Sequence, residues 1–185
     1  MRNPLLLLLL AVVLFSCAQP EARRPVSRSS GSFIKESVDR NQELVAQQEA
    51  AIKAIINKDT TATYTASANG FWYLKTVQDS TSTYRAKFGD ELVFDHQIED
   101  IYGNVIYPKE ELSPQRYLMD QMPLISGLRE ALKLMGAGES MTLYLPSYTA
   151  YGYYGDDNKI GVNYPLKIKV TLKEIVPQTN NETNN

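Results

Sequence analysis

Apolar positions between residues 123 and 155 repeat with two different periods, which predict a helix, a turn and a strand. The helical stripe consists of Leu124, Leu128, Leu132 and Met135. A stripe with this spacing places one side of a helix against a core. The glycines at 136 and 138 are typical of a helix end, because glycine adopts a left-handed backbone without steric cost. Residues 141–145 then alternate as in a strand, which Pro146 ends.

Residues 33–58 predict a single long helix ahead of the strands. Its apolar stripe is sparse, and pairs such as Glu49 and Lys53 have the spacing that supports a solvent-exposed helix. We expect a spacer, or a helix that docks on the following domain. A homodimer formed through this helix is the less favoured alternative, because the stripe is thin.

The remaining periodic segments predict strands and turns. Residues 60–69 are polar and favour a strand, and residues 70–77, 86–96 and 164–172 contain strand-like alternation. Residues 98–107 predict a hairpin with its turn at Gly103. Together with the helix near residue 128, these segments indicate an α+β domain.

The first residues have the pattern of a targeting segment. Arg2 precedes an apolar run from Leu5 to Phe15 that is too short to span a bilayer as a mature helix. Residues 1–16 are therefore interpreted as a signal peptide. Cys17, the only cysteine, follows directly and resembles the acylated cysteine of a bacterial lipobox. Ordinary secretory cleavage with a spare thiol is the alternative.

Two further segments lack the apolar residues needed for a core. Residues 17–32 combine prolines, serines and arginines and predict a flexible tether. The tail at 177–185 is rich in Asn and Thr and is predicted to be disordered. The tether would separate an anchored Cys17 from the helix.

Composition excludes several kinds of chemistry. The net charge of −2 gives no indication of a nucleic-acid partner, and the 43% hydrophobic content suffices for a core. His96 is the only histidine, so a nucleophile–histidine constellation would have to use it. We find no metal-ligand spacing, phosphate-binding glycine loop or dinucleotide motif, and we expect no metal and no cofactor.

A family resemblance rests on four motifs that occur in order at matching spacing. They are LISGL at 124–128, LMGAGE at 134–139, Pro146, and AYG at 150–152. In this combination the chain resembles the FKBP-type peptidyl-prolyl isomerases. The resemblance implies an antiparallel sheet wrapped around a short helix over residues 60–176, preceded here by the helix at 33–58.

The chain is most similar to lipid-anchored isomerases associated with bacterial gliding motility. The shared features include the lipobox, GFWY at 70–73, GNVIY at 103–107 and the tyrosine-rich loop from Pro146. This resemblance implies a periplasm-facing envelope protein, with the outer membrane favoured. Its substrates would be proline-containing exported polypeptides of the gliding or secretion machinery.

The same resemblance implies a set of groove residues. Tyr151 would donate its hydroxyl hydrogen, and the backbone N–H of Ile125 would hold a second substrate carbonyl. The expected substrate-binding residues are Phe94, His96, Ile106, Tyr107, Tyr117, Leu124, Leu128, Ile160 and Ile168.

Several of these positions depart from the family pattern. His96 stands where the family has a tyrosine, Ile106 where it has a phenylalanine, and Leu128 where many relatives have a tryptophan. Tyr107 stands where the family has an aspartate, and Asp95 or Glu110 could compensate. The acidic cluster at 156–158 is interpreted as a solvated turn.

Two functions are consistent with the sequence: a prolyl isomerase, which we favour, and a non-catalytic assembly factor that binds a partner in the same groove.

Overall fold

The computed structural model describes residues 31–79 and 81–178. The predicted signal peptide, Cys17 and most of the tether lie outside the described residues, as does the tail from residue 179. The elements are α2 (Gly31–Lys58), β1 (Thr65–Ala66), β2 (Trp72–Val77), β3 (Glu91–Asp100), β4 (Val105–Tyr107), α3 (Lys109–Leu112), β5 (Gln115–Leu118), α4 (Ser126–Lys133), β6 (Ser140–Leu145), the 3₁₀ turn η1 (Ser147–Thr149) and β7 (Leu166–Val176).

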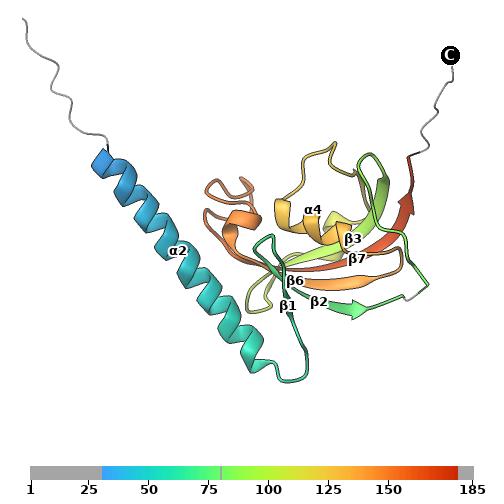
Figure 1. The fold of residues 1–185 in the computed structure, drawn as a ribbon, viewed down its shortest axis with the longest axis horizontal. Helices are drawn as coiled ribbons and strands as arrows, with labels where there is room; N and C mark the ends of the chain where they lie inside the picture. Colours follow the sequence, from blue (N-terminus) through green and yellow to red (C-terminus); the bar gives the residue numbers. More distant parts are fainter. Residues whose placement is uncertain (1–30, 80, 179–185) are drawn as a thin grey trace, which may run out of the picture. The chain divides into compact units, whose positions relative to one another are not determined.

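The strands form one antiparallel sheet. Its order is β1-β2-β6-β7-β3-β4, and β5 pairs with the first half of β3. The long strands β3 and β7 pair along their whole length, from Glu91 opposite Val176 to Asp100 opposite Leu166. Helix α4 lies against one face of this sheet (Figure 1). The predicted α+β class, with an antiparallel sheet around a short helix and a helix before it, is confirmed.

Helix α4 forms because its apolar stripe has a core to enter. Leu128, Ala131 and Leu132 are at most 1% exposed and pack against the sheet residues Leu143 and Ile168. Full burial of one such leucine contributes roughly 1.5–3 kcal/mol. Gly127 allows a close approach, since a Cβ there would lie 2.6 Å from Leu145 Cδ2. The helix therefore lies directly against the end of β6.

The other face of the sheet carries a second apolar cluster. Neighbouring strand residues point to opposite faces, so Leu143 enters the α4 core while Tyr144 enters this cluster. Ile52 of α2 is fully buried there with Ile101 and Tyr144. The structure thus docks this part of α2 on the sheet. Residues 31–37 belong to a separate unit and are described only as helix.

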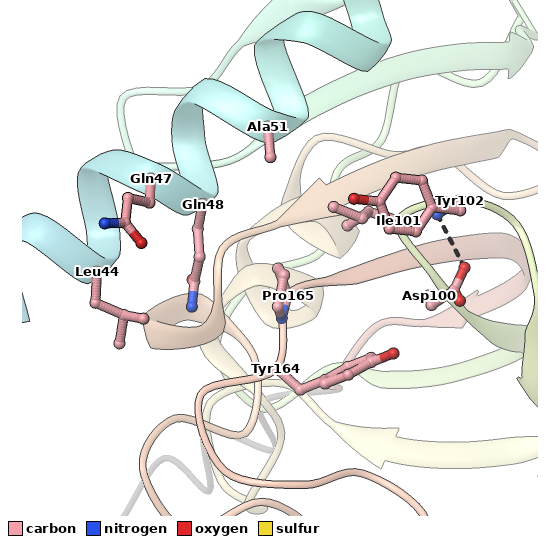
Figure 2. A pocket seen from close by; sticks show the side chains of 9 residues that line it. All are labelled: Leu44, Gln47, Gln48, Ala51, Asp100, Ile101, Tyr102, Tyr164 and Pro165. Atoms are coloured by element: carbon pink, nitrogen blue, oxygen red, sulfur yellow. Dashed lines mark hydrogen bonds between the residues drawn. The ribbon is translucent and has the colours of Figure 1, made fainter.

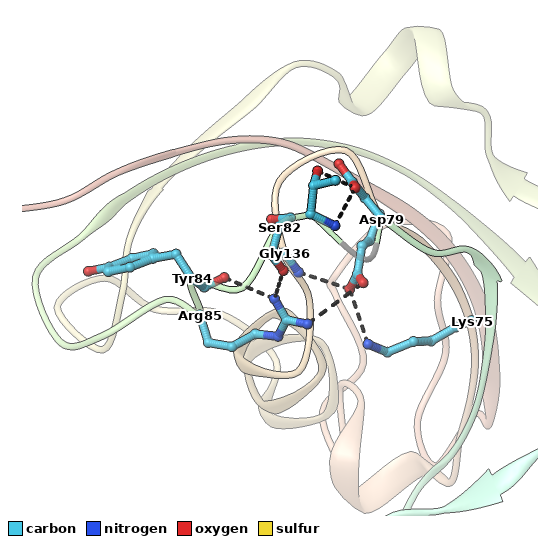
Figure 3. Close-up of polar contacts among 8 residues, drawn as sticks. Lys75, Asp79, Ser82, Tyr84, Arg85 and Gly136 are labelled. Carbon is cyan, nitrogen blue, oxygen red and sulfur yellow. Dashed lines mark hydrogen bonds and ion pairs between the residues drawn. The ribbon is translucent and has the colours of Figure 1, made fainter.

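A buried carboxylate holds the turn after α4. Glu139 is 3% exposed and accepts a hydrogen bond of 2.9 Å from the Gly136 N–H. Lys75 lies 3.1 Å and Arg85 3.7 Å from its carboxylate, and Figure 3 shows them approaching the turn from two sides. Burial would raise the pKa of Glu139, but these partners outweigh it and lower that pKa. The turn is therefore fixed by charge.

Candidate functional site

A groove of about 580 Å³ opens between α4, α3 and β3. Its lining is mainly apolar, with two aromatic rings and a few polar side chains. The lining residues are His96, Ile98, Leu112, Gln115, Met122, Pro123, Leu124, Ile125, Leu128, Arg129, Ala150 and Tyr151. Such an apolar cleft with few polar groups suits a short, largely uncharged segment of peptide.

Five of the expected site residues meet in this groove, namely His96, Leu124, Ile125, Leu128 and Tyr151. Ile125 is the N-cap residue of α4, a position at which backbone N–H groups have no partner within the helix. Leu128 follows one turn later and is 1% exposed, so it forms part of the floor. The helix therefore supplies an apolar surface and a backbone donor together.

The other expected residues do not line the groove. Phe94 and Ile168 are fully buried, and Tyr117 and Ile160 are 3% exposed in the same core. Alternation along β3 explains the case of Phe94: it shares a face with His96, but the sheet and core cover it completely. Its ring lies 5.4 Å from the ring of His96 and supports it. These residues lie in the core beneath the lining of the groove.

Ile106 and Tyr107 of β4 also lie outside the lining. Ile106 is half-buried and packs against the core, and Tyr107 is 7% exposed. Their placement follows from the short β4, which pairs with the end of β3 beyond His96. The β3–β4 hairpin thus lies beside the groove, and its β4 residues are not among the lining residues.

Several lining residues were missed from the sequence. Leu112, Gln115, Met122 and Pro123 come from the stretch between β4 and α4, where no hydrophobic periodicity guided the prediction. Ile98 could have been found, because it lies two positions after His96 on the same strand face. Arg129 brings the one cationic side chain among the lining residues.

His96 is a neutral wall of the groove. The residue is 5% exposed, and its Nδ1 is buried without a hydrogen-bond partner among the described residues. Burial lowers the pKa of His96 to about 4, against the opposing effect of the Asp95 charge. At neutral pH the imidazole is therefore uncharged and adds no charge to the groove.

Neither predicted substitute for the missing aspartate reaches Tyr107. Asp95 is held by Lys109 and Lys173, each with its Nζ 2.8 Å from Oδ2. Glu110 is exposed on α3. The carboxylate that meets Tyr107 is Asp156, which accepts the hydrogen bond of the Tyr107 hydroxyl.

The acidic cluster is therefore not simply a solvated turn, as the sequence suggested. Asp156 Oδ1 accepts hydrogen bonds from the backbone N–H groups of Ile160, at 2.7 Å, and Asn158, at 3.0 Å. Burial would raise the pKa of Asp156, but its hydrogen bonds outweigh this and lower it. Asp156 stays ionised and connects its loop to β4.

Tyr151 is a hydrogen-bond donor at the edge of the groove. Burial, followed by the negative charge of Asp156 and the nearby Tyr107, raises the pKa of the Tyr151 hydroxyl above its usual value. The hydroxyl therefore keeps its proton over the physiological pH range. With the Ile125 N–H, the groove offers two donors in an apolar setting.

Over residues 31–79 and 81–178, no group of three or more His, Cys, Asp or Glu side chains is arranged to hold a metal ion. In the same ranges no helix combines the length and the apolar character needed to cross a bilayer. The groove can bind and desolvate a peptide and donate hydrogen bonds to it.

Comparisons with known proteins agree with this geometry. Residues 81–173 match the model of the family described as FKBP-type peptidyl-prolyl cis-trans isomerase. A peptidyl-prolyl cis-trans isomerase from Pseudomonas syringae pv. tomato has a similar structure, with a TM-score of 0.56, 19% identity, and coverage of 71% of this chain and 96% of that one. FkpA from Escherichia coli has a TM-score of 0.58 and 22% identity, and the match covers 95% of this chain and 83% of FkpA. No curated protein matches the chain.

Proposed function

We propose that this chain, which belongs to the family of FKBP-type peptidyl-prolyl cis-trans isomerases, is a lipid-anchored isomerase of the bacterial cell envelope. Its substrates would be X-Pro bonds in exported proteins, including components of a gliding or secretion machinery. These bonds isomerise in tens to hundreds of seconds without catalysis, which is slow enough to limit folding.

The observation that carries the catalytic part is the apolar groove with Tyr151 and the Ile125 N–H at its edge. The barrier to be lowered is amide resonance, about 18–20 kcal/mol. A twisted X-Pro amide has less dipolar character than a planar one, so an apolar, water-poor groove favours it. A site that binds the twisted form more tightly than either planar form accelerates the reaction.

Each group then has a defined part in this reaction. Leu128 and the neutral His96 hold the proline side of the substrate away from water. Tyr151 donates its hydroxyl hydrogen to one substrate carbonyl, and Ile125 donates its N–H to another. A tenfold gain in rate requires about 1.4 kcal/mol of differential binding. Two hydrogen bonds that shorten in the twisted state can supply several such factors.

The envelope part of the proposal is supported by the sequence of the first residues. A short apolar run ends at Phe15, two residues before Cys17, and residues 18–32 carry little apolar surface. Transfer of a diacylglyceryl group from a phospholipid to the Cys17 sulfur, with loss of the thiol proton and of the phosphate headgroup, would supply two acyl chains. Two chains hold a protein at a bilayer far longer than one chain does. An outer-membrane location with the isomerase domain in the periplasm fits this arrangement.

The catalytic test is isomerisation of a proline-containing peptide by the chain from residue 17 onward, with Cys17→Ser to avoid acylation. We expect Ile125→Asp to lower kcat/KM by roughly a hundredfold and Tyr151→Phe by roughly tenfold. Tyr154→Phe is the matched control, because Tyr154 is 82% exposed on the same loop. A well-folded wild type without activity would exclude catalysis of such peptides.

The anchoring test follows the full chain in its host. Wild type should incorporate a labelled fatty acid and sediment with membranes, whereas Cys17→Ser should do neither. Recovery of unlabelled wild type in the soluble periplasmic fraction would contradict the anchor. The isomerase assay does not depend on this outcome, so the two parts of the proposal are tested independently.

A second candidate is a non-catalytic assembly factor, and Tyr107 at the family's aspartate position favours it. Here the acidic group reaches the site only indirectly, through the Tyr107 hydroxyl. The same assay separates the two candidates. Binding of a proline-containing peptide, abolished by Ile125→Asp but without catalysis by wild type, would support the assembly factor.

A further inference from the structure

Helix α2 carries a buried polar side chain where it faces the domain. Gln48 is 7% exposed. Its Oε1 accepts a hydrogen bond of 2.8 Å from the Ser147 N–H, and its Nε2 donates one of 2.8 Å to the Asn163 carbonyl. In Figure 2 the Gln48 side chain points away from α2, on the side of the helix that carries Leu44 and Ala51. One amide thus binds both ends of a loop about a hundred residues away in sequence.

The loop completes this pattern with its own backbone. The Gly152 N–H donates to the Ser147 carbonyl at 2.8 Å, and the Asn163 N–H donates to the Gly152 carbonyl at 2.8 Å. Gln48, Ser147, Gly152 and Asn163 therefore form a closed ring of hydrogen bonds. Tyr151 directly precedes Gly152 in this ring, and its side chain lines the groove.

The surroundings of Gln48 make these bonds hard to replace. Gln48 also lines a mainly apolar, open pocket of about 310 Å³ together with Leu44, Ala51, Ile101 and Pro165. Ser147 is 3% exposed and its hydrogen bond with Gln48 is buried, so an unmet N–H there would remain costly. Only a side chain with both a donor and an acceptor satisfies the two loop ends at once.

Docking of the helix does not depend on Gln48. Ile52, one turn further along α2, is fully buried in the apolar cluster with Ile101 and Tyr144. Ile55 and Ile56 pack against the same cluster. Loss of the Gln48 amide should therefore leave α2 in place while releasing the loop.

We propose that Gln48 is a positioning residue for the isomerase reaction: its amide closes the hydrogen-bonded ring that fixes Tyr151 at the edge of the groove. This inference rests on the proposed isomerase function. Helix α2 then has a role in catalysis, because it sets the position of Tyr151 through the backbone of the loop. A displacement of about 1 Å in such a group can cost up to a hundredfold in rate.

The test replaces Gln48 in the chain from residue 17 onward, with Cys17→Ser in every protein, and compares it with its neighbour. Gln48→Leu removes both hydrogen bonds. Gln47→Leu is the matched control, because Gln47 is exposed and its amide donates a hydrogen bond to Glu43, on the helix itself. We expect Gln48→Leu to lower kcat about tenfold with little change in KM. Gln47→Leu should change neither.

A double-mutant cycle with Tyr151→Phe separates positioning from general damage. If Gln48 acts through Tyr151, the loss caused by Gln48→Leu should shrink to less than about twofold in the Tyr151→Phe background. The same tenfold loss in both backgrounds would overturn the proposal.

Amide hydrogen exchange supplies a readout that is independent of activity. Exchange at Ser147, Gly152 and Asn163 should be about tenfold faster in Gln48→Leu, while exchange in the β3–β7 pairing stays unchanged. Unchanged loop exchange would overturn the proposal. Should wild type show no isomerase activity, the proposed function and the positioning role both fail, and exchange still reports whether Gln48 holds the loop.

A second variant covers the case in which Gln48→Leu does not fold. Gln48→Glu keeps an acceptor for the Ser147 N–H but has no donor for the Asn163 carbonyl. It should retain protection of the Ser147 amide and still lose kcat. Wild-type kcat in this variant would overturn the proposal, because the ring would then be dispensable.

Discussion

The groove has two walls that are held in place by different forces. The helix wall, formed by Leu124, Ile125 and Leu128, rests on apolar packing of α4 against the sheet. The loop wall, formed by Ala150 and Tyr151, is positioned by hydrogen bonds that involve Gln48, Tyr107 and Asp156. A change in the helix wall should therefore cost stability first, and a change near the loop wall should cost rate first.

The largest effect should come from the helix wall. Leu128→Ala leaves a cavity beneath the groove, because the side chain is 1% exposed. We expect a loss of about 2–5 kcal/mol in the free energy of unfolding, measured by urea denaturation. Leu134→Ala, at the exposed C-cap of the same helix, should cost no more than about 1 kcal/mol. Equal losses of stability in the two variants would show that burial of Leu128 does not stabilise the helix wall more than exposed Leu134 does.

The pH dependence of stability tests His96, which lines the groove from β3 beside these two walls. The pKa of His96 is about 4 in the folded protein, below the usual 6.5, so the unfolded chain binds more protons between these values. The stability due to neutral His96 is complete above pH 6.5 and is lost as the pH falls towards 4, by about 3 kcal/mol. Chemical denaturation at several pH values measures this loss.

A histidine-free variant isolates this contribution from that of the carboxylates. Asp95, Glu99 and Glu139 have lowered pKa values and also lose stabilisation in acid. His96→Gln retains those groups, so its stability should fall less steeply between pH 6.5 and 4. Parallel curves for the two proteins would show that His96 has the same pKa in the folded and the unfolded chain, which would contradict the lowered value.

A smaller effect on stability, but a clear one on rate, is expected near the loop wall. Tyr107→Phe removes the hydroxyl that binds Asp156 and that accepts the Lys159 N–H. We expect a loss of about 1–2 kcal/mol in stability and a fall of a few-fold in kcat/KM. Asp156→Asn should give a similar fall in kcat/KM. Tyr102→Phe is the matched control, since Tyr102 is 77% exposed in the same hairpin.

The smallest effect should come from the exposed ion pair between α3 and the loop. Lys159 Nζ lies 2.7 Å from Glu111, and both side chains are about 40% exposed. Glu111→Gln should change stability by less than about 0.5 kcal/mol and kcat/KM by less than twofold. A larger fall in rate at low salt would show that surface charge also holds the loop wall.

The helix wall was predicted from the sequence, and the loop wall only in part. Periodicity placed Leu128 and Leu132 on one helix face, because a short helix contains its own signal. Leu124, expected on the same face, lies ahead of the helix, because α4 begins at Ser126. Tyr151 was assigned through the AYG motif alone. Nothing local indicated that Gln48 would contact the same loop, since sequence separation hides a hydrogen bond between distant segments.

Expectations at single strand positions were less accurate for a related reason. Strand alternation gives Phe94 and His96 the same face, but burial depth decides which of them reaches a ligand. Likewise, the carboxylates expected to compensate near Tyr107 were Asp95 and Glu110. The loop from Gly152 to Ile160 instead folds back and supplies Asp156.

The sequence by itself determined the long strands, the short helix and the family motifs, because these depend on local periodicity and on residue types at fixed spacing. It did not indicate α3 or β5, and the strand expected over residues 60–69 is reduced to the two residues of β1. Tertiary structure decided which apolar residues face the groove and which lie beneath it. It also brought Gln48 and Asp156 to the loop of Tyr151. Such contacts join segments far apart in the chain, and their stability arises only when burial removes the competing water.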